Sequence, residues 1–253
     1  MAEPVYRPVI AVAKGVFRYL GLSFDITGED YVPAVGGGVV AINHTGYLDF
    51  ALAGLAFRSK KRLVRFMAKK EVFDHKLSGP LMRGMKHIPV DREAGAGSFN
   101  AAVQALRSGE LVGVFPEATV SQSFELKEFK SGAVRMATDA GVPVIPVIVW
   151  GSQRVWTKGR KREKSKGTSI RIVVGEPFVP EADATAATAE LKKRMQVLLE
   201  QARSTYQGSP RDDSDRWWLP VSMGGTAPTL AEAEAADAEV RAARAAKRAA
   251  RDG

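Results

Sequence analysis

Residues 39–49 read Val-Val-Ala-Ile-Asn-His-Thr-Gly-Tyr-Leu-Asp, and this stretch indicates the fold class. Its first four residues form an unbroken apolar run, which is typical of a strand buried on both faces of a sheet. From Asp49 to Phe57 the residues favour a helix. A short polar segment with one glycine joins the two. The stretch therefore predicts a strand, a loop and a helix, which is the repeating unit of an α/β fold.

The same alternation continues from Gly38 to about Tyr206. Predicted strands cover residues 39–42, 63–67, 88–90, 111–115, 144–149 and 170–174. Predicted helices cover residues 49–57, 72–82, 98–106, 132–140 and 187–204, with Ser98 capping the third and Gly141 ending the fourth. Continuous apolar strands separated by helices favour a mostly parallel central sheet that is flanked by helices on both faces.

Three regions differ in composition. Residues 1–37 contain an amphipathic helix and a lead-in, residues 38–206 form the main domain, and residues 207–253 form a linker and an Ala-rich, charged tail that is either helical or disordered. The N-terminal helix has an apolar arc of Val9, Ile10, Ala13, Val16, Phe17 and Leu20, opposite Arg7, Lys14 and Arg18. Such a helix either lies in a membrane interface or packs on the core of its own protein.

Composition excludes several classes of site. The chain has 253 residues and a net charge of +9, and the 30 basic and 20 acidic residues before Tyr206 place the excess on the main domain. A basic surface suits anionic partners such as phosphates, CoA, carrier proteins or lipid, whereas no nucleic-acid motif is evident. The absence of cysteine excludes disulfides, cysteine zinc sites and a thiolate nucleophile. We expect neither a membrane-spanning helix nor a secretory signal, which makes a cytosolic location the default.

His44 and Asp49 are the first candidate functional pair. Five residues on a regular helix separate two side chains by about 140°, so they do not face each other. They meet only if His44 lies in the loop and Asp49 lies in the first helical turn. In that geometry Asp49 holds one imidazole nitrogen and leaves the other free as a general base.

Three further blocks follow predicted strands or lie within one. Arg92 follows the strand at 88–90 and has the planar fork that binds phosphate, although an Asp91–Arg92 surface pair is the simpler interpretation. Glu117 and Thr119 follow the strand at 111–115, where a plain turn is the alternative. Pro143 and Pro146 interrupt an apolar strand and shape either the core or an acyl pocket. His75 and His87 fit structural roles better than catalytic ones.

Taken in order, these four blocks resemble the signature of the glycerolipid acyltransferase superfamily, and of the 1-acyl-glycerol-3-phosphate acyltransferases in particular. The family pattern is His-x4-Asp, a glycine-containing block ending in Ile/Phe-x-x-Arg, Phe-Pro-Glu-Gly-Thr, and Val-Pro-Ile-x-Pro-Val. The matching segments are residues 44–49, 84–92, 115–119 and 142–147, so the resemblance covers roughly residues 38–150. Ala118 stands where the family has glycine, which leaves the acceptor open.

The resemblance implies that His44 is the general base and that Asp49 orients it. It also implies that the acceptor's phosphate and glycerol are held by Lys69, Arg92, Glu117 and Thr119, with Lys70 as a substitute for Lys69. The implied donor is acyl-CoA or acyl-carrier protein, without cofactor or metal. The implied acceptor is the sn-2 hydroxyl of 1-acyl-glycerol-3-phosphate (lysophosphatidic acid), which would yield phosphatidic acid in phospholipid biosynthesis. Backbone amides near His44 are expected to stabilise the oxyanion.

Other functions stay open at this point. The same chemistry on glycerol 3-phosphate, a lysophospholipid or a mannosylated phosphoinositide is the nearest alternative. A non-enzymatic protein that binds an anionic membrane surface is an alternative from another class. In either case we expect a peripheral protein at the cytoplasmic face of the cell membrane, with no nucleic-acid partner.

Overall fold

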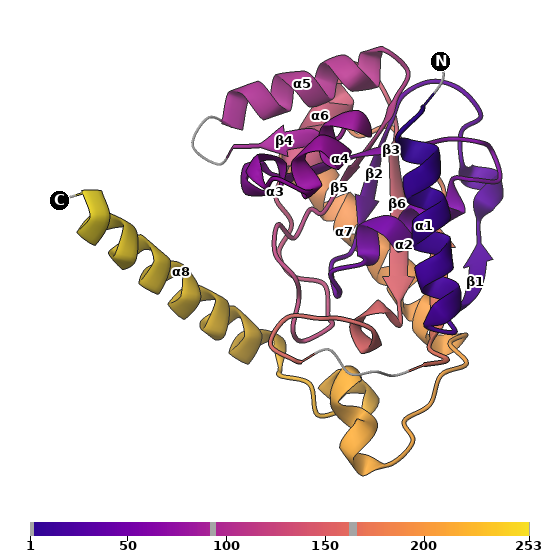
Figure 1. Cartoon of the computed structure of the whole chain (residues 1–253), viewed down its shortest axis with the longest axis vertical. Coiled ribbons are helices and arrows are strands. Elements are labelled where there is room, and N and C mark those ends of the chain that lie inside the picture. The colour runs from indigo at the N-terminus through magenta and orange to yellow at the C-terminus, as the bar shows by residue number, and fades with distance from the viewer. Residues whose placement is uncertain (1–2, 92–94, 162–165, 253) are drawn as a thin grey trace.

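The computed structural model describes residues 3–91, 95–161 and 166–252, and it shows the predicted α/β class (Figure 1). Seven strands of the described residues form one sheet in the order β1-β7-β6-β2-β5-β3-β4. Their bounds are β1 (Ser23–Thr27), β2 (Gly38–Ile42), β3 (Val64–Lys69), β4 (Ile88–Val90), β5 (Leu111–Val114), β6 (Val144–Trp150) and β7 (Ser169–Val174).

Helices cover both faces of this sheet. They are α1 (Tyr6–Tyr19), α2 (Asp49–Ala56), α3 (Lys70–Asp74), α4 (Ser78–Gly84), α5 (Gly95–Arg107), α6 (Gly132–Ala140) and α7 (Ala184–Ser204). The helix α8 (Leu230–Asp252) lies off the sheet (Figure 1). Short 3-10 helices are η1 (Glu29–Tyr31), η2 (Ser152–Arg154), η3 (Asp213–Trp218) and η4 (Val221–Met223). One apolar core joins α1 and α2 to the sheet, and a second joins α5, α6 and α7 to the opposite face.

Strand direction positions the functional edge. The strands β6, β2, β5, β3 and β4 run parallel, so their carboxyl ends share one edge of the sheet. In open α/β sheets this is the edge where ligands bind. The strand β7 runs antiparallel to β6, and β1 pairs in parallel with β7. The sheet is therefore mostly parallel, with one reversed pair of strands at one side.

Three local predictions were wrong. The helix at 72–82 is two helices, α3 and α4; Gly79 lies so close to the Phe73 carbonyl that a Cβ atom would stand 2.2 Å from that oxygen. Ser98 does not cap α5, which begins at Gly95; its hydroxyl accepts the Asp91 amide at 3.2 Å instead. The edge strand β1 was missed. In contrast, Gly141 ends α6 in the left-handed conformation, as predicted.

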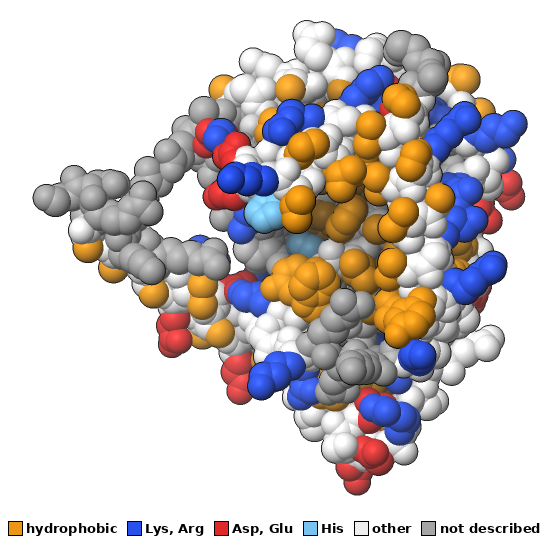
Figure 2. All heavy atoms as spheres, in the orientation of Figure 1, with side chains coloured by type: hydrophobic (Ala, Val, Ile, Leu, Met, Phe, Trp, Pro, Cys, Tyr) orange, Lys and Arg blue, Asp and Glu red, His pale blue; other side chains and the backbone are white. Residues whose placement is uncertain are grey.

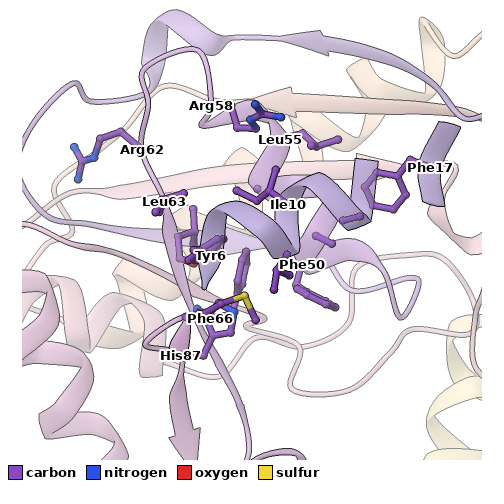
Figure 3. Close-up of a pocket in the computed structure, with 16 residues that line it drawn as sticks. Tyr6, Ile10, Phe17, Phe50, Leu55, Arg58, Arg62, Leu63, Phe66 and His87 are labelled. Atoms are coloured by element: carbon purple, nitrogen blue, oxygen red, sulfur yellow. Dashed lines mark hydrogen bonds between the residues drawn. The ribbon is translucent and has the colours of Figure 1, made fainter. Parts of the chain in front are cut away.

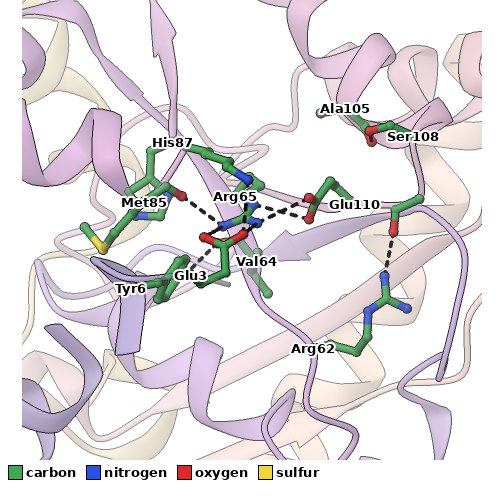
Figure 4. A network of polar contacts seen from close by, with 12 residues as sticks. Glu3, Tyr6, Arg62, Val64, Arg65, Met85, His87, Ala105, Ser108 and Glu110 are labelled. Atoms are coloured by element: carbon green, nitrogen blue, oxygen red, sulfur yellow. Dashed lines mark hydrogen bonds and ion pairs between the residues drawn. The ribbon is translucent and has the colours of Figure 1, made fainter. Parts of the chain in front are cut away.

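The helix α1 packs on the protein's own core. Phe17 is buried, and the Tyr6 hydroxyl donates to the Val64 carbonyl at 2.7 Å. Behind it, the buried Arg65 guanidinium pairs with Glu3 at 2.6 Å and with Glu110 at 3.2 Å (Figure 4). Of the two interpretations of this helix, core packing is therefore correct for its inner face. Its outer face still exposes apolar side chains, among them Val12, Val16 and Tyr19.

The segment after Tyr206 docks on the body before α8 begins. Trp217 and Trp218 are buried in the second core, and the guanidinium of Arg154 lies 4.3 Å from the Trp218 ring centroid. Beyond this anchor, α8 extends away from the body (Figure 1). The Ala-rich, charged part of the predicted tail is thus helical from Leu230 to Asp252. Among the residues that the structure describes, no helix is long and apolar enough to span a bilayer.

Candidate active site

The loop after β2 brings His44 and Asp49 together. Asp49 is the first residue of α2 and is fully buried. Its Oδ2 atom accepts the amides of Thr45 at 2.7 Å and Gly46 at 2.8 Å, and it lies 3.1 Å from His44 Nδ1. The loop-then-helix geometry required by the spacing is thus present, and one carboxylate oxygen fixes both the loop and the imidazole.

The His44 ring is held in one orientation and is partly exposed to solvent. With its hydrogen on Nδ1, the ring donates to Asp49, which leaves Nε2 as a lone-pair acceptor. The ring stacks on Phe115, with centroids 4.0 Å apart and planes at 19°. The side chain is 18% exposed, so a substrate reaches a ring whose position the protein already holds. This is the arrangement that a general base needs.

The backbone amides of the His44 loop are not free to hold an oxyanion. The amide of His44 donates to Glu117 Oε1 at 2.8 Å, those of Thr45 and Gly46 donate to Asp49, and that of Tyr47 donates to the Trp156 carbonyl. Each of these four donors already has an acceptor within the chain. The expectation that they stabilise the oxyanion is therefore corrected, because such a role requires an unoccupied, correctly aimed donor.

Glu117 ties the His44 loop to a second segment. Its side chain is buried, with Oε1 accepting the His44 amide and Oε2 accepting the Lys127 amide at 3.1 Å. Burial raises the pKa of Glu117 to about 8, although the two backbone hydrogen bonds act in the opposite direction. In this structure Glu117 positions the loop that carries His44. Its predicted contact with substrate hydroxyls stays a prediction.

Ala118 and Thr119 continue this turn. Ala118 has a φ of +59°, the left-handed conformation for which glycine is best suited. This positive φ explains why the family pattern has glycine at this position. Alanine keeps the same turn, but its Cβ atom strains the backbone there. The Thr119 hydroxyl accepts from Lys127 Nζ at 2.7 Å and lies 3.3 Å from Asp237 Oδ2 in α8.

The two predicted phosphate-binding cations are differently placed. Lys69 is the last residue of β3 and is exposed at the same edge as His44. Lys70, the substitute, pairs with Asp74 at 2.8 Å. Arg92 lies outside the described residues, two positions after the end of β4 at Val90. The phosphate contacts of Lys69 and Arg92 therefore stay predictions.

Pro146 lies within β6 and Pro143 directly precedes it, so both are at the start of the strand and not at the edge that carries His44. Pro143 precedes β6, and its carbonyl accepts the Val39 amide at 2.9 Å. Pro146 pairs with Ala41 of β2, and β7 begins to pair with β6 only at Val147. The missing N–H of Pro146 thus falls where one neighbouring strand has already ended, which is the special place that a proline in a strand requires.

Several residues that hold the site were missed from the sequence. The Asn43 side chain donates to the Val149 carbonyl at 3.0 Å and accepts the Val149 amide at 2.7 Å, so it bridges β2 and β6. The Thr157 hydroxyl donates to the Thr45 carbonyl at 2.6 Å. Gly46 lies so close to Ser152 that a Cβ atom would stand 3.0 Å from its carbonyl oxygen. Only Asn43 carried a local signal, as a polar residue at the end of an apolar strand.

An apolar face surrounds the site. Exposed aromatic side chains at its mouth include Tyr47, Phe50 and Trp156, and Figure 2 shows hydrophobic side chains gathered on this face with lysine and arginine side chains around them. Between α1 and α2 lies a cavity of about 70 Å³, which Ile10 and Phe17 line from one side and Phe50 and Phe66 from the other (Figure 3). This cavity is lined by Phe50 and Ala51 of α2, which directly follow Asp49 in the sequence.

A model of the acyltransferase family matches residues 23–150. The chain belongs to the acyltransferase family. This confirms the resemblance to the glycerolipid acyltransferases that the four sequence blocks indicated. The acyltransferase match ends at the last residue of β6, so it contains β1 to β6 and the loops that carry His44 and Glu117.

Relatives of this acyltransferase come from several bacteria. It is 29% identical over 182 residues to a 1-acyl-sn-glycerol-3-phosphate acyltransferase of Bacillus subtilis, covering 68% of this chain and 86% of the relative. It is 32% identical over 189 residues to a probable enzyme of the same name from Mycoplasma pneumoniae, covering 70% and 68%. The crystal structure of the lysophosphatidic acid acyltransferase PlsC from Thermotoga maritima has the same fold, with a TM-score of 0.65, 20% identity, and coverage of 80% and 81%.

Proposed function

We propose that this acyltransferase moves a fatty acyl group from a thioester to the sn-2 hydroxyl of 1-acyl-glycerol-3-phosphate, forming phosphatidic acid. The observation that carries the proposal is the His44–Asp49 pair, held at the carboxyl edge of the sheet in a chain whose relatives bear this activity in their names. The donor is acyl-CoA or acyl-carrier protein, and no cofactor takes part.

The chemistry runs through His44 in one direct displacement. Nε2 takes the proton of the acceptor hydroxyl while the oxygen attacks the thioester carbonyl carbon. The carbon–sulfur bond then breaks, and the leaving thiolate takes the proton back from the imidazolium. Asp49, 3.1 Å from Nδ1, stabilises the positive ring between these steps. The chain has no cysteine, which fits transfer without an acyl-cysteine intermediate.

The surroundings of the site fit a lipid substrate. The cavity between α1 and α2 is lined mostly by apolar side chains, Phe50 among them, and would need to widen to take a fatty acyl chain. Exposed apolar side chains on α1 and at the mouth, with cations around them, suit peripheral binding to an anionic membrane surface. We therefore propose that the enzyme works at the cytoplasmic face of the cell membrane. In a co-sedimentation assay, we expect the protein to pellet with anionic vesicles but not with neutral ones.

Thiol release from acyl-CoA, with and without lysophosphatidic acid, tests the activity. We expect release that depends on the acceptor and falls by about 10²–10⁴-fold in His44→Ala. His75→Ala is the matched control, because His75 is an exposed histidine outside the catalytic pair. Release without acceptor would indicate a thioesterase. Normal activity in His44→Ala would overturn the role of His44 as the base, whereas a wild type that releases no thiol with any acceptor would favour a non-enzymatic membrane-binding protein.

A different acceptor is the second candidate, and Ala118 favours it. The strained turn at Ala118 leads directly to Thr119, so a shift there moves a predicted acceptor contact. The panel therefore includes glycerol 3-phosphate, lysophospholipids and a mannosylated phosphoinositide. Faster turnover on one of these than on lysophosphatidic acid would reassign the acceptor and leave the reaction class unchanged.

A further inference from the structure

A carboxylate of the C-terminal helix fills a cluster of cations beside the active site. Asp237 lies two turns into α8, and its Oδ2 atom lies 2.5 Å from Lys127 Nζ while its Oδ1 atom pairs with Lys158 Nζ. The Thr119 hydroxyl lies 3.3 Å from the same Oδ2 atom. The side chains of Asp237 and Lys127 are only 5% and 8% exposed, whereas that of Lys158 is 28% exposed, so the cluster is buried on the Lys127 side and open on the Lys158 side.

The cluster adjoins the His44 loop on two sides. Thr119 follows Glu117, whose carboxylate holds the His44 amide, by two residues. Lys158 directly follows Thr157, whose hydroxyl holds the Thr45 carbonyl. The two lysines and Thr119 therefore lie on the segments that position the catalytic pair. A ligand bound between them is therefore held by the same two segments that position the His44 loop.

The helix is attached to the body by little else. Among the α8 side chains that the structure describes, only Ala233 and Asp237 are buried. A methyl group contributes little apolar burial, so the ion pairs of Asp237 dominate the attachment. The helix is also self-contained, because Thr229 and Glu232 form a reciprocal capping box at its start. The hydrogen bonds that begin this helix therefore do not depend on its contact with the body.

The chemistry of the cluster matches a phosphate group. Two ammonium groups and a hydroxyl converge on an anion, and a buried ammonium without a counter-charge is costly. Burial would raise the pKa of Asp237, yet the hydrogen bonds and charges of Lys127 and Lys158 hold it below its ordinary value. The Asp237 carboxylate therefore neutralises the two lysines in the way that a bound phosphate would. Without it, another anion has to take its place.

We propose that Lys127, Lys158 and Thr119 form a phosphate-binding subsite of the substrate, and that Asp237 occupies it until substrate arrives. The inference rests on the proposed function, since the phosphate is that of the acyl acceptor or that of the CoA donor. Binding of substrate displaces α8, and the apparent affinity is lowered by the fraction of chains in which Asp237 holds the site.

The variant Asp237→Asn removes the competing charge and keeps the size of the side chain. We expect the KM of the phosphate-bearing substrate to fall about tenfold or more. Glu234→Gln, on the same helix and exposed, is the matched control and leaves KM unchanged. Ala233→Glu lifts the helix without touching the cations, and it should reproduce the fall even if Asp237→Asn does not fold. Adding Lys127→Gln to Asp237→Asn should abolish the gain.

The substrates distinguish the source of the phosphate. A fall in KM for lysophosphatidic acid but not for acyl-CoA assigns the subsite to the acceptor, and the reverse assigns it to the donor. A short acyl thioester without phosphate serves as the neutral donor. An unchanged KM for both substrates in Asp237→Asn and Ala233→Glu overturns the inference, because α8 is then a structural element only.

Failure of the inference and failure of the proposed function are separable. If the wild-type chain acylates no acceptor, the proposed function fails. The subsite is then still tested by inorganic phosphate, which should raise the melting temperature of Asp237→Asn at lower concentration than that of the wild type. Equal responses to phosphate would remove the subsite as well.

Discussion

Replacing Asp49 by asparagine is the most direct test of how the catalytic pair works. Asparagine keeps the size of the side chain and one oxygen that can accept the amides of Thr45 and Gly46. Its NH2 group takes the place of Oδ1, a buried atom that has no hydrogen-bond partner within the described chain. The loop is therefore preserved, while the negative charge beside His44 is lost.

The size of the effect follows from the distance between the two charges. When His44 takes the substrate proton, its ring becomes positive 3.1 Å from Asp49 Oδ2. At this separation an effective dielectric of about 20 to 40 gives roughly 5 to 3 kcal/mol of attraction. A loss of that size in the transition state lowers kcat by about 10²–10⁴-fold. The amide oxygen that replaces Oδ2 still accepts from Nδ1, so the imidazole tautomer is kept and the loss reports the charge.

The assay is kcat for thiol release in the presence of the acceptor, together with the urea midpoint as a measure of folding. Asp139→Asn is the matched control, because Asp139 is an exposed aspartate on α6. We expect kcat to fall in Asp49→Asn alone while its urea midpoint shows that it stays folded. A fall of less than about tenfold in a folded Asp49→Asn would refute the role of the charge, and the pair would then serve only to shape the loop.

Further outcomes follow from the same site. Ala118→Gly should raise the unfolding free energy by up to about 1 kcal/mol in urea, because relief of left-handed strain exceeds the added chain entropy; a decrease contradicts this. Gly46→Ala should destabilise by about 1–3 kcal/mol and slow turnover, because its Cβ meets Ser152, and an unchanged melting temperature argues against that contact. The buried Glu117, with a pKa of about 8, holds a proton that the unfolded chain releases above 4.5, so stability is lost as pH rises toward 8. The buried His87, with a pKa of about 4 against 6.5, gives the opposite slope only below about 6.5. Between about pH 6.5 and 8 the unfolding free energy should therefore fall with pH in the wild type and stay flatter in Glu117→Gln.

Much of the fold was predictable because its signals are local. Apolar runs such as residues 111–114 and 144–150 become buried parallel strands, and a glycine such as Gly141 ends its helix where it stands. The strand β1 was not predictable in this way, since its five residues are all exposed or half-buried and its pairing with β7 lies far away in sequence. The direction of β7 likewise depends on a long connection rather than on its own residues.

The contacts of the site were likewise predictable only where they join residues that are close in sequence. His44 and Asp49 are five residues apart, so their geometry follows from one loop. The contacts of Thr119 with Lys127 and Asp237 join segments up to 118 residues apart, and no local pattern announces them. The packing of Trp217 and Trp218 on the body is likewise non-local, since Arg154, far away in sequence, stacks on the Trp218 ring.

The Asn43 side chain has a consequence for anyone who redesigns this enzyme. Its amide makes the two hydrogen bonds to Val149 that a strand backbone would make, which lets the main chain turn out of the sheet at His44. The sheet is thus completed by one side chain, and no other residue of that length offers a donor and an acceptor side by side. A library aimed at a new acceptor should therefore randomise exposed positions such as Tyr47 and leave Asn43 untouched.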